Sequence, residues 1–256
     1  MDLTPPPMPQ VVARPPRGAV LVISPHPDDE IIGPGATLIH HAEAGDPIRL
    51  VFVCSGVHGD PDGLFDVEGY AERRANESRS VAARYLKTDD IHFYGYPDSL
   101  DSDGLDSTFG SLPDDHDEKR RVLIEGLAQD IAGHIEATQP RCVYYPWQGE
   151  VHLDHWAVGS AVKLLATNEA RRFPDTAFMG YEVWTTLVPE TLVDTSQTHA
   201  AKLEAIRCFE TQMAYRDYAS IVDGLNVHRA ALTRDRSRTA AEAFVGHYGK
   251  GVQSCE

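Results

Sequence analysis

The sequence predicts an α/β fold: a Rossmann-like, mostly parallel sheet with helices on both faces, in a single domain. Three observations predict it: short apolar runs rich in β-branched residues, helical patterns between them, and regular alternation of the two along the chain. Continuous apolar runs are typical of parallel strands, which are buried on both faces. The chain of 256 residues is long enough for one such domain with a substantial core.

The expected elements alternate from residue 19 onward. Apolar runs predict strands at residues 19–24, 48–54, 91–94, 141–146 and 178–184. Helical patterns predict helices at residues 31–44, 70–86, 118–138, 155–170, 200–209 and 225–231. Gly45 follows the first of these helices and supplies its C-terminal stop.

Other segments are expected to lie outside these elements. Residues 1–17 contain six prolines and are expected to form an extended, proline-rich N-terminal arm, with the domain itself at 18–256. Polar loops at 56–69 and 95–117 follow the carboxyl ends of expected strands. Both loops would border the same crevice, which suits substrate binding.

Charge and composition limit the partners. A formal net charge of −16 argues against nucleic acid and suits a neutral or cationic small molecule. No apolar run approaches the roughly 20 residues of a membrane helix, and no signal-peptide pattern opens the chain, so no membrane partner and a cytoplasmic location are expected. Cys54 and Cys142 lie in strand-like runs and are expected in the core. The oligomeric state stays open, a homo-oligomer included.

Two polar clusters each follow an expected strand. The first is His26-Pro27-Asp28-Asp29-Glu30, and the second is His152-Leu153-Asp154-His155. Because open α/β sheets carry their chemistry at the carboxyl ends of strands, we expect the two clusters to meet. Each cluster alone has a simpler explanation, since His-Pro-Asp is common in turns and aspartate caps helix N-termini. Two such clusters, each after a strand, are much less expected by chance.

His26, Asp29 and His155 can supply a His₂Asp metal site. Catalytic zinc sites commonly use three such ligands and leave one position for water. Asp28 is expected to diverge from Asp29 and to act as the general base. A dinucleotide site is a poor alternative, because no G-x-G-x-x-G motif is present and the adjacent carboxylates would repel a pyrophosphate.

The second cluster adds acid–base groups. His152 is placed to donate a proton or a hydrogen bond to a developing oxyanion. Asp154 is expected to orient His152 and keep it protonated, because an adjacent carboxylate raises the pKa of an imidazole. A metal, a base and an oxyanion donor together indicate hydrolysis of a carbonyl compound, most naturally an amide.

These motifs resemble the signatures of the PIG-L/LmbE-like family of zinc-dependent de-N-acetylases. The first signature is a strand followed by S-P-H-P-D-D-E, and the second is H-x-D-H, somewhat over a hundred residues later. A third and weaker match is the A-E-A-F stretch within residues 240–244. The chain departs from the family at Cys54-Ser55-Gly56, where many relatives have T-D-G.

The resemblance implies one Zn²⁺ per chain, bound by His26, Asp29 and His155, with Asp28 as the base on zinc-bound water. It also implies that His152 polarises the amide carbonyl or assists the leaving amine, and that Asp154 tunes His152.

Two further residues match segments that contact the sugar in relatives. Arg74 lies in R-A-N-E and Asp98 in G-Y-P-D-S, so both are expected substrate contacts. An ion pair for Arg74 and a plain turn for Asp98 are the structural alternatives. Trp147 and Trp156 flank the second cluster, and one of them could stack on a sugar, with core packing as the alternative.

The function that the resemblance implies is removal of the N-acetyl group from an N-acetylglucosamine-like moiety of a small molecule. An antibiotic precursor or a pseudodisaccharide thiol precursor, such as that of mycothiol, would fit. The alternatives are an amidase for a larger acyl group, on a thiol conjugate or a lipoglycopeptide sugar, and a non-catalytic sugar-binding module. Iron(II) or cobalt would accept the same nitrogen and oxygen ligands as zinc.

Overall fold

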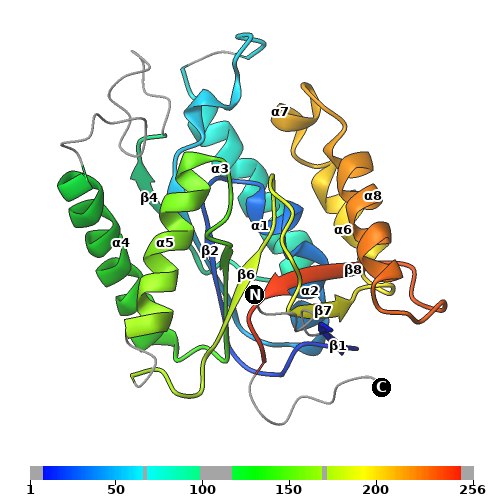
Figure 1. The fold of residues 1–256 in the computed structure, drawn as a ribbon. Coiled ribbons are helices and arrows are strands. Elements are labelled where there is room, and N and C mark those ends of the chain that lie inside the picture. Colours follow the sequence, from blue (N-terminus) through cyan, green and yellow to red (C-terminus); the bar gives the residue numbers. More distant parts are fainter. Residues whose placement is uncertain (1–7, 66–67, 99–116, 169–171, 249–256) are drawn as a thin grey trace, which may run out of the picture.

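The computed structural model describes residues 8–65, 68–98, 117–168 and 172–248, which form one eight-stranded sheet with helices on both faces (Figure 1). The strand order is β1-β7-β8-β6-β5-β2-β3-β4, and only β8 runs antiparallel to its neighbours. The strands are β1 Gln10–Val12, β2 Val20–Ser24, β3 Ile48–Cys54, β4 Ile91–Tyr96, β5 Cys142–Pro146, β6 Ala177–Tyr181, β7 Thr191–Asp194 and β8 Ala241–Val245. The predicted fold class is therefore confirmed.

Two apolar cores lie on the two faces of the sheet. Successive residues of β2 divide between them, with Val20 and Val22 in one core and Leu21 and Ile23 in the other, as expected of a strand buried on both faces. The first core packs against α2, η2, α6 and α8, and the second against α4 and α5. The helices are α1 Asp29–Ile32, α2 Gly35–Ala44, η1 Val57–Gly59, α3 Tyr70–Val81, η2 Ala82–Leu86, α4 Asp117–Thr138, α5 Leu153–Asn168, α6 His199–Ile206, α7 Glu210–Met213 and α8 Tyr218–Ala231.

The order of the strands explains why the two sequence clusters meet. The chain passes from β2 to β3 to β4 on one side of β2, whereas β5 pairs with the other side of β2. This reversal opens a crevice beyond the carboxyl ends of β2 and β5, where open sheets bind their ligands. The first cluster follows β2 and the second follows β5, so both lie at this crevice.

The expected helix at 31–44 is divided into α1 and α2. Pro34 interrupts the helical hydrogen bonds, because it has no N–H to donate. Gly33 ends α1 beneath the ring of Tyr181, and a Cβ at this position would collide with that ring. The short α1 helix therefore directs Asp29 back toward His26, instead of continuing the axis of α2.

Several other boundaries differ from expectation. Strand β6 ends at Tyr181, and α8 begins earlier than predicted, at Tyr218, where the Asp217 carboxylate accepts a hydrogen bond from the N–H of Ser220. Strands β1, β7 and β8 and the helix α7 were not predicted. Strand β1 falls within the expected arm, where Gln10–Val12 pair with β7. The boundary between arm and domain stays a prediction, and most of the loop at 95–117 lies outside the described residues.

Cys54 and Cys142 are buried, as predicted for core residues. Among the described helices, none combines the length and the apolar composition that crossing a membrane requires.

Candidate active site

Three side chains of the two clusters bring one atom each to a common point. His26 Nδ1 lies 3.3 Å from Asp29 Oδ2 and 3.3 Å from His155 Nε2. His155 Nε2 lies 3.1 Å from Asp29 Oδ2, and all three residues are buried. The backbone N–H of His26 also donates to Asp29 Oδ2, which fixes the aspartate against the strand end. The predicted set is thus brought together.

These three residues fit a divalent metal. At zinc–nitrogen bonds of about 2.0–2.1 Å, the ligand atoms of a tetrahedral zinc lie about 3.4 Å apart, close to the spacing seen here. The cluster also attracts positive charge. Burial alone would lower the pKa of His26, but hydrogen bonds to Asp154 and Asp29 raise it to about 10. Burial acts to raise the pKa of Asp29, but the neighbouring His155 ring outweighs it and holds the pKa of that carboxyl far below its usual range.

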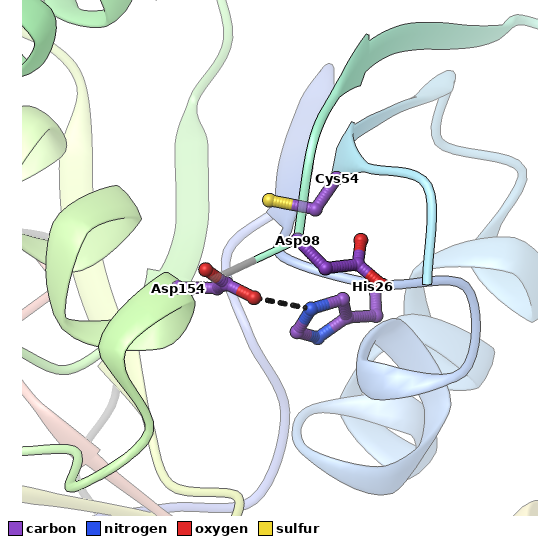
Figure 2. Close-up of side chains that lie close together, drawn as sticks. All are labelled: His26, Cys54, Asp98 and Asp154. Atoms are coloured by element: carbon purple, nitrogen blue, oxygen red, sulfur yellow. Dashed lines mark hydrogen bonds and ion pairs between the residues drawn. The ribbon is translucent and has the colours of Figure 1, made fainter. Parts of the chain in front are cut away.

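Asp154 orients the His26 ring. Its Oδ2 lies 2.9 Å from His26 Nε2, the ring nitrogen that faces away from Asp29 (Figure 2). A carboxylate on the far nitrogen of a metal-binding histidine fixes the tautomer and orientation of the ring. The same oxygen is 3.9 Å from His152 Nδ1, so Asp154 engages His26 more closely than the predicted partner His152.

His152 has a different state from the one predicted. Burial, together with the nearby rings of His155 and His26, lowers the pKa of His152 to about 4, and Asp154 only partly opposes this. The ring is therefore neutral near pH 7, not held protonated as expected. The backbone N–H of Asp154 donates to Nδ1 at 3.3 Å, and this assignment leaves the proton on Nε2.

Asp28 lies beside the ligand cluster in a strained backbone conformation. Its φ is 132°, which a residue with a side chain rarely adopts and which is typical of functional sites. Its carboxylate makes no helix cap, so the capping alternative does not apply to Asp28. Instead, Oδ2 accepts a hydrogen bond from Arg74 at 3.0 Å. Burial raises the pKa of Asp28 to about 7, although the Arg74 charge opposes the increase.

Arg74 is buried and bound mainly to the protein. Its guanidinium donates to the carbonyl oxygens of Gly56 at 2.8 Å and Pro27 at 2.7 Å, in addition to Asp28. The ion-pair alternative for Arg74 is thus present in the structure. Its role as a sugar contact stays a prediction, although the side chain does line the cavity described below.

Asp98 shapes the loop that follows β3. Its Oδ1 accepts from the N–H of Gly56 at 2.7 Å and the hydroxyl of Ser55 at 3.2 Å, and its Oδ2 accepts from the N–H of His58 at 3.0 Å. Both oxygens are therefore engaged within the protein. Direct binding of a sugar by Asp98 likewise stays a prediction.

A second group of candidate ligands shares His26 and comprises His26, Cys54, Asp98 and Asp154 (Figure 2). The metal-binding atoms of Cys54, Asp98 and Asp154 are less free to bind a metal than those of the first group. Burial raises the pKa of the Cys54 thiol well above its usual value, whereas a metal requires the thiolate. The carboxylates of Asp98 and Asp154 already accept hydrogen bonds or pair with His26. The donors of His26, Asp29 and His155 therefore fit a metal better than those of the second group.

Glu150 is a residue of the site that the sequence analysis missed. Its Oε2 lies 3.9 Å from His155 Nδ1, a buried nitrogen without a hydrogen-bond partner among the described residues. The Glu150 carboxylate also accepts from the backbone N–H groups of residues 183–185, at 2.6 to 3.2 Å. One buried carboxylate thus lies between the His155 ring and the loop after β6. Its position before the H-x-D-H motif is the only sequence signal for it.

The cluster opens into a cavity of about 520 Å³. Part of its lining comes from the predicted residues and from the loop after β3, including His58. Another part was not predicted and comprises Trp184, Gln212, Tyr215, Arg216 and Tyr218. Neither Trp147 nor Trp156 lines the cavity; the indole of Trp147 donates to the carbonyl of Thr185, and Trp156 packs against the second core.

A family model matches more than half of the chain. It is the model of the PIG-L family, described as GlcNAc-PI de-N-acetylase, and it matches residues 21–166. These residues include both motifs and every predicted site residue.

The sequence identity to individual relatives is low. The 1D-myo-inositol 2-acetamido-2-deoxy-alpha-D-glucopyranoside deacetylase of Kineococcus radiotolerans is 33% identical over 155 residues, which cover 56% of this chain but only 43% of that protein. A second deacetylase of the same description, from Saccharopolyspora erythraea, is 25% identical over 77% of this chain and 84% of its own. The structure of N,N'-diacetylchitobiose deacetylase from Pyrococcus horikoshii has the same fold, with a TM-score of 0.63 and 23% identity over 90% of this chain and 83% of its own.

Proposed function

The chain belongs to the PIG-L family of de-N-acetylases, and on that premise we propose that it is a metal-dependent N-deacetylase acting on an N-acetylglucosamine-like moiety of a small molecule. The observation that carries the proposal is the convergence of His26, Asp29 and His155 on one point beside Asp28 and His152. The curated relatives are named as deacetylases of an acetamido sugar, which supports the same substrate class.

The metal would be held by His26 Nδ1, Asp29 Oδ2 and His155 Nε2. A Zn²⁺ ion bound there would supply Lewis acidity toward the amide carbonyl and a water of lowered pKa. Asp154 would orient the His26 ring, and Glu150 the His155 ring, each from the ring nitrogen that does not face the metal.

Asp28 is the base in this proposal. Arg74 engages its Oδ2, which leaves Oδ1 as the oxygen that takes a proton from the attacking water. The new carbon–oxygen bond forms as that proton reaches Asp28. Asp28 then gives the proton to the amide nitrogen, the carbon–nitrogen bond breaks, and acetic acid and the free amine leave, the acid losing its proton to solvent to become acetate.

His152 would act as a neutral hydrogen-bond donor. Because the backbone N–H of Asp154 occupies Nδ1, the proton lies on Nε2, from which His152 can stabilise the negative charge that develops on the carbonyl oxygen. A fixed donor of this kind needs no change of protonation during the reaction. This assignment replaces the protonated His152 that the sequence suggested.

The test is acetate release from N-acetylglucosaminyl compounds by protein prepared with Zn²⁺, with Fe²⁺ and with a chelator. We expect chelator-sensitive release and recovery after a metal is added back. Asp28→Asn should lower kcat by about 10²- to 10⁴-fold while metal content is unchanged, and the exposed Asp89→Asn is the matched control. Release that survives the chelator, or an active Asp28→Asn, would contradict the proposal; release of only longer acyl groups would identify an amidase instead.

A further inference from the structure

Glu30 is a buried acid of the first cluster to which the proposed reaction gives no role. The residue is fully buried, and it belongs to neither group of candidate metal ligands. Within the described part of the chain it has no ion-pair partner, and its Oε1 has no hydrogen-bond partner. Burying an acidic side chain with so few partners costs stability, so packing alone does not explain a glutamate at this position.

The other oxygen of Glu30 holds the backbone of Asp28. Its Oε2 accepts a hydrogen bond from the N–H of Asp28 at 2.9 Å. The carbonyl oxygen of Asp28 accepts from the N–H groups of Ile31 and Ile32, both at 2.9 Å. Both backbone polar groups of Asp28 are therefore bound while its φ is 132°. A strained conformation of this kind persists only where the surrounding structure holds it.

The turn into α1 differs from an ordinary helix start. An aspartate before a helix commonly caps it with its own carboxylate, and in a capping box a glutamate of the first turn also reaches back to the backbone N–H of that residue. Asp28 precedes α1 but makes no side-chain cap, whereas the bond to Glu30, the second residue of α1, is present. Glu30 thus holds the turn without using the Asp28 carboxylate, which is bound to Arg74 and lines the cavity.

We propose that Glu30 is a positioning residue for Asp28, because its carboxylate fixes the strained backbone from which the proposed base reaches the attacking water. The inference rests on the proposed function, since it takes Asp28 to be the base. The acceptor oxygen carries the role. A glutamine, whose amide oxygen also accepts, can therefore replace Glu30, whereas an apolar side chain of similar length cannot.

The test compares Glu30→Met with Glu30→Gln in acetate release and metal content, under conditions in which urea unfolding shows each variant to be folded. Glu30→Met should lower kcat by about 100-fold, as expected for a misplaced catalytic group, with KM and bound metal close to those of the wild type. Glu30→Gln should recover most of the lost kcat. Glu43→Met, at an exposed glutamate of α2, is the control that should leave kcat and KM unchanged. If Glu30→Met does not fold, Glu30→Asp takes its place, because the shorter side chain withdraws the acceptor.

Wild-type kcat in Glu30→Met, or a loss of activity that follows a loss of metal, would overturn the proposal. Glu30→Gln as impaired as Glu30→Met would overturn it too, and all three results leave the deacetylase proposal standing. If the wild type releases no acetate, the deacetylase proposal fails, and hydrogen exchange of the Asp28 amide then decides whether Glu30 holds Asp28. Slow exchange in the wild type and in Glu30→Gln, with fast exchange in Glu30→Met, would support the inference. Equal exchange in all three proteins would overturn it.

Discussion

The Arg74 guanidinium holds the Asp28 carboxylate at 3.0 Å and, through the same nitrogen, the carbonyl oxygen of Pro27 at 2.7 Å. One side chain thus fixes both the strained backbone at Asp28 and the direction of its carboxylate. The guanidinium of Arg74 is closely packed, because a Cβ at position 56, which is Gly56 here, would collide with it. We conclude that Arg74 is a positioning residue for the proposed base.

Arg74→Lys should lower kcat more than it raises KM. Lysine keeps the charge but cannot hold Pro27, Asp28 and Gly56 together, and a misplaced base costs up to about 100-fold in rate. Steady-state kinetics of acetate release measure the effect. The control is Arg73→Lys, at the adjacent, exposed arginine. Because Arg73 does not position Asp28, kcat of this variant should stay within about twofold of the wild type. A pure KM effect would indicate that Arg74 mainly contacts the sugar.

Asp154→Asn should weaken metal binding. The amide cannot accept the hydrogen bond from His26 Nε2–H as strongly as the carboxylate does, and loss of such partners lowers metal affinity by about 10- to 100-fold. Competition with a chromophoric chelator measures the affinity directly. Asp175→Asn changes an exposed residue just before β6, at the amino ends of the parallel strands, and should bind metal like the wild type. Unchanged affinity in Asp154→Asn would show that Asp154 does not support His26.

The residues that could be predicted from sequence are those next to strand ends. His26 and Asp29 lie in one turn after β2, and His155 follows β5, so the parallel sheet alone brings them together. The partner of Asp154 could not be predicted in this way. Its neighbour in sequence is His152, but its closest ring is that of His26, 128 residues away, and only the pairing of β5 with β2, which brings the start of α5 beside His26, decides between them.

The unpredicted elements lacked a local signal. Strand β1 has only three residues, and β8 is the sequence Ala-Glu-Ala-Phe-Val, in which alanine and glutamate are poor strand formers. Pairing of β8 with both β6 and β7 overrides these preferences. Trp184 was missed for a related reason, because its sequence position suggested the end of a strand, whereas β6 stops at Tyr181.

The weak A-E-A-F motif acquires a structural role through Glu242. Its carboxylate accepts from the N–H groups of Ala36 and Thr37 at the start of α2 and pairs with the buried Lys202 at 2.6 Å. Lys202 also donates to the carbonyl oxygen of Gly33, the residue that ends α1. The pair therefore fixes the turn between α1 and α2, on which the position of Asp29 depends.

Lys202→Met should destabilise the protein by about 3–5 kcal/mol, because it leaves the Glu242 charge buried and unpaired. The double variant Lys202→Met/Glu242→Gln should lose less, since the remaining group is neutral. Urea unfolding monitored by circular dichroism measures both free energies of unfolding. Lys163→Met, on the exposed side of α5, is the control. A double variant less stable than Lys202→Met would contradict this account of the pair.

A buried polar chain at the far end of α2 gives a prediction about pH that does not involve the metal site. Asp46 accepts from Arg17 Nε and from the backbone N–H of Gly18, and its other oxygen contacts His41 Nδ1 at 2.8 Å. Burial acts to raise the pKa of Asp46, but the hydrogen bonds from Arg17, His41 and Gly18 outweigh it and lower the pKa. Burial also lowers the pKa of His41, whose Nε2 faces the Tyr144 hydroxyl.

Because the folded pKa of Asp46 lies below its unfolded value of about 3.9, the folded state binds fewer protons than the unfolded state in the interval between them. The stability that this carboxylate contributes is therefore complete above about pH 4 and is lost as the pH falls through the folded pKa. Asp46→Asn should cost about 1–3 kcal/mol at pH 7, since its hydrogen-bond donors lose a charged acceptor. The difference from the wild type should shrink below about pH 4, where the wild-type carboxylate becomes protonated. Urea unfolding of both proteins from pH 7 down to pH 3 measures it, and a difference that stays constant over that range would show that Asp46 does not titrate differently on folding.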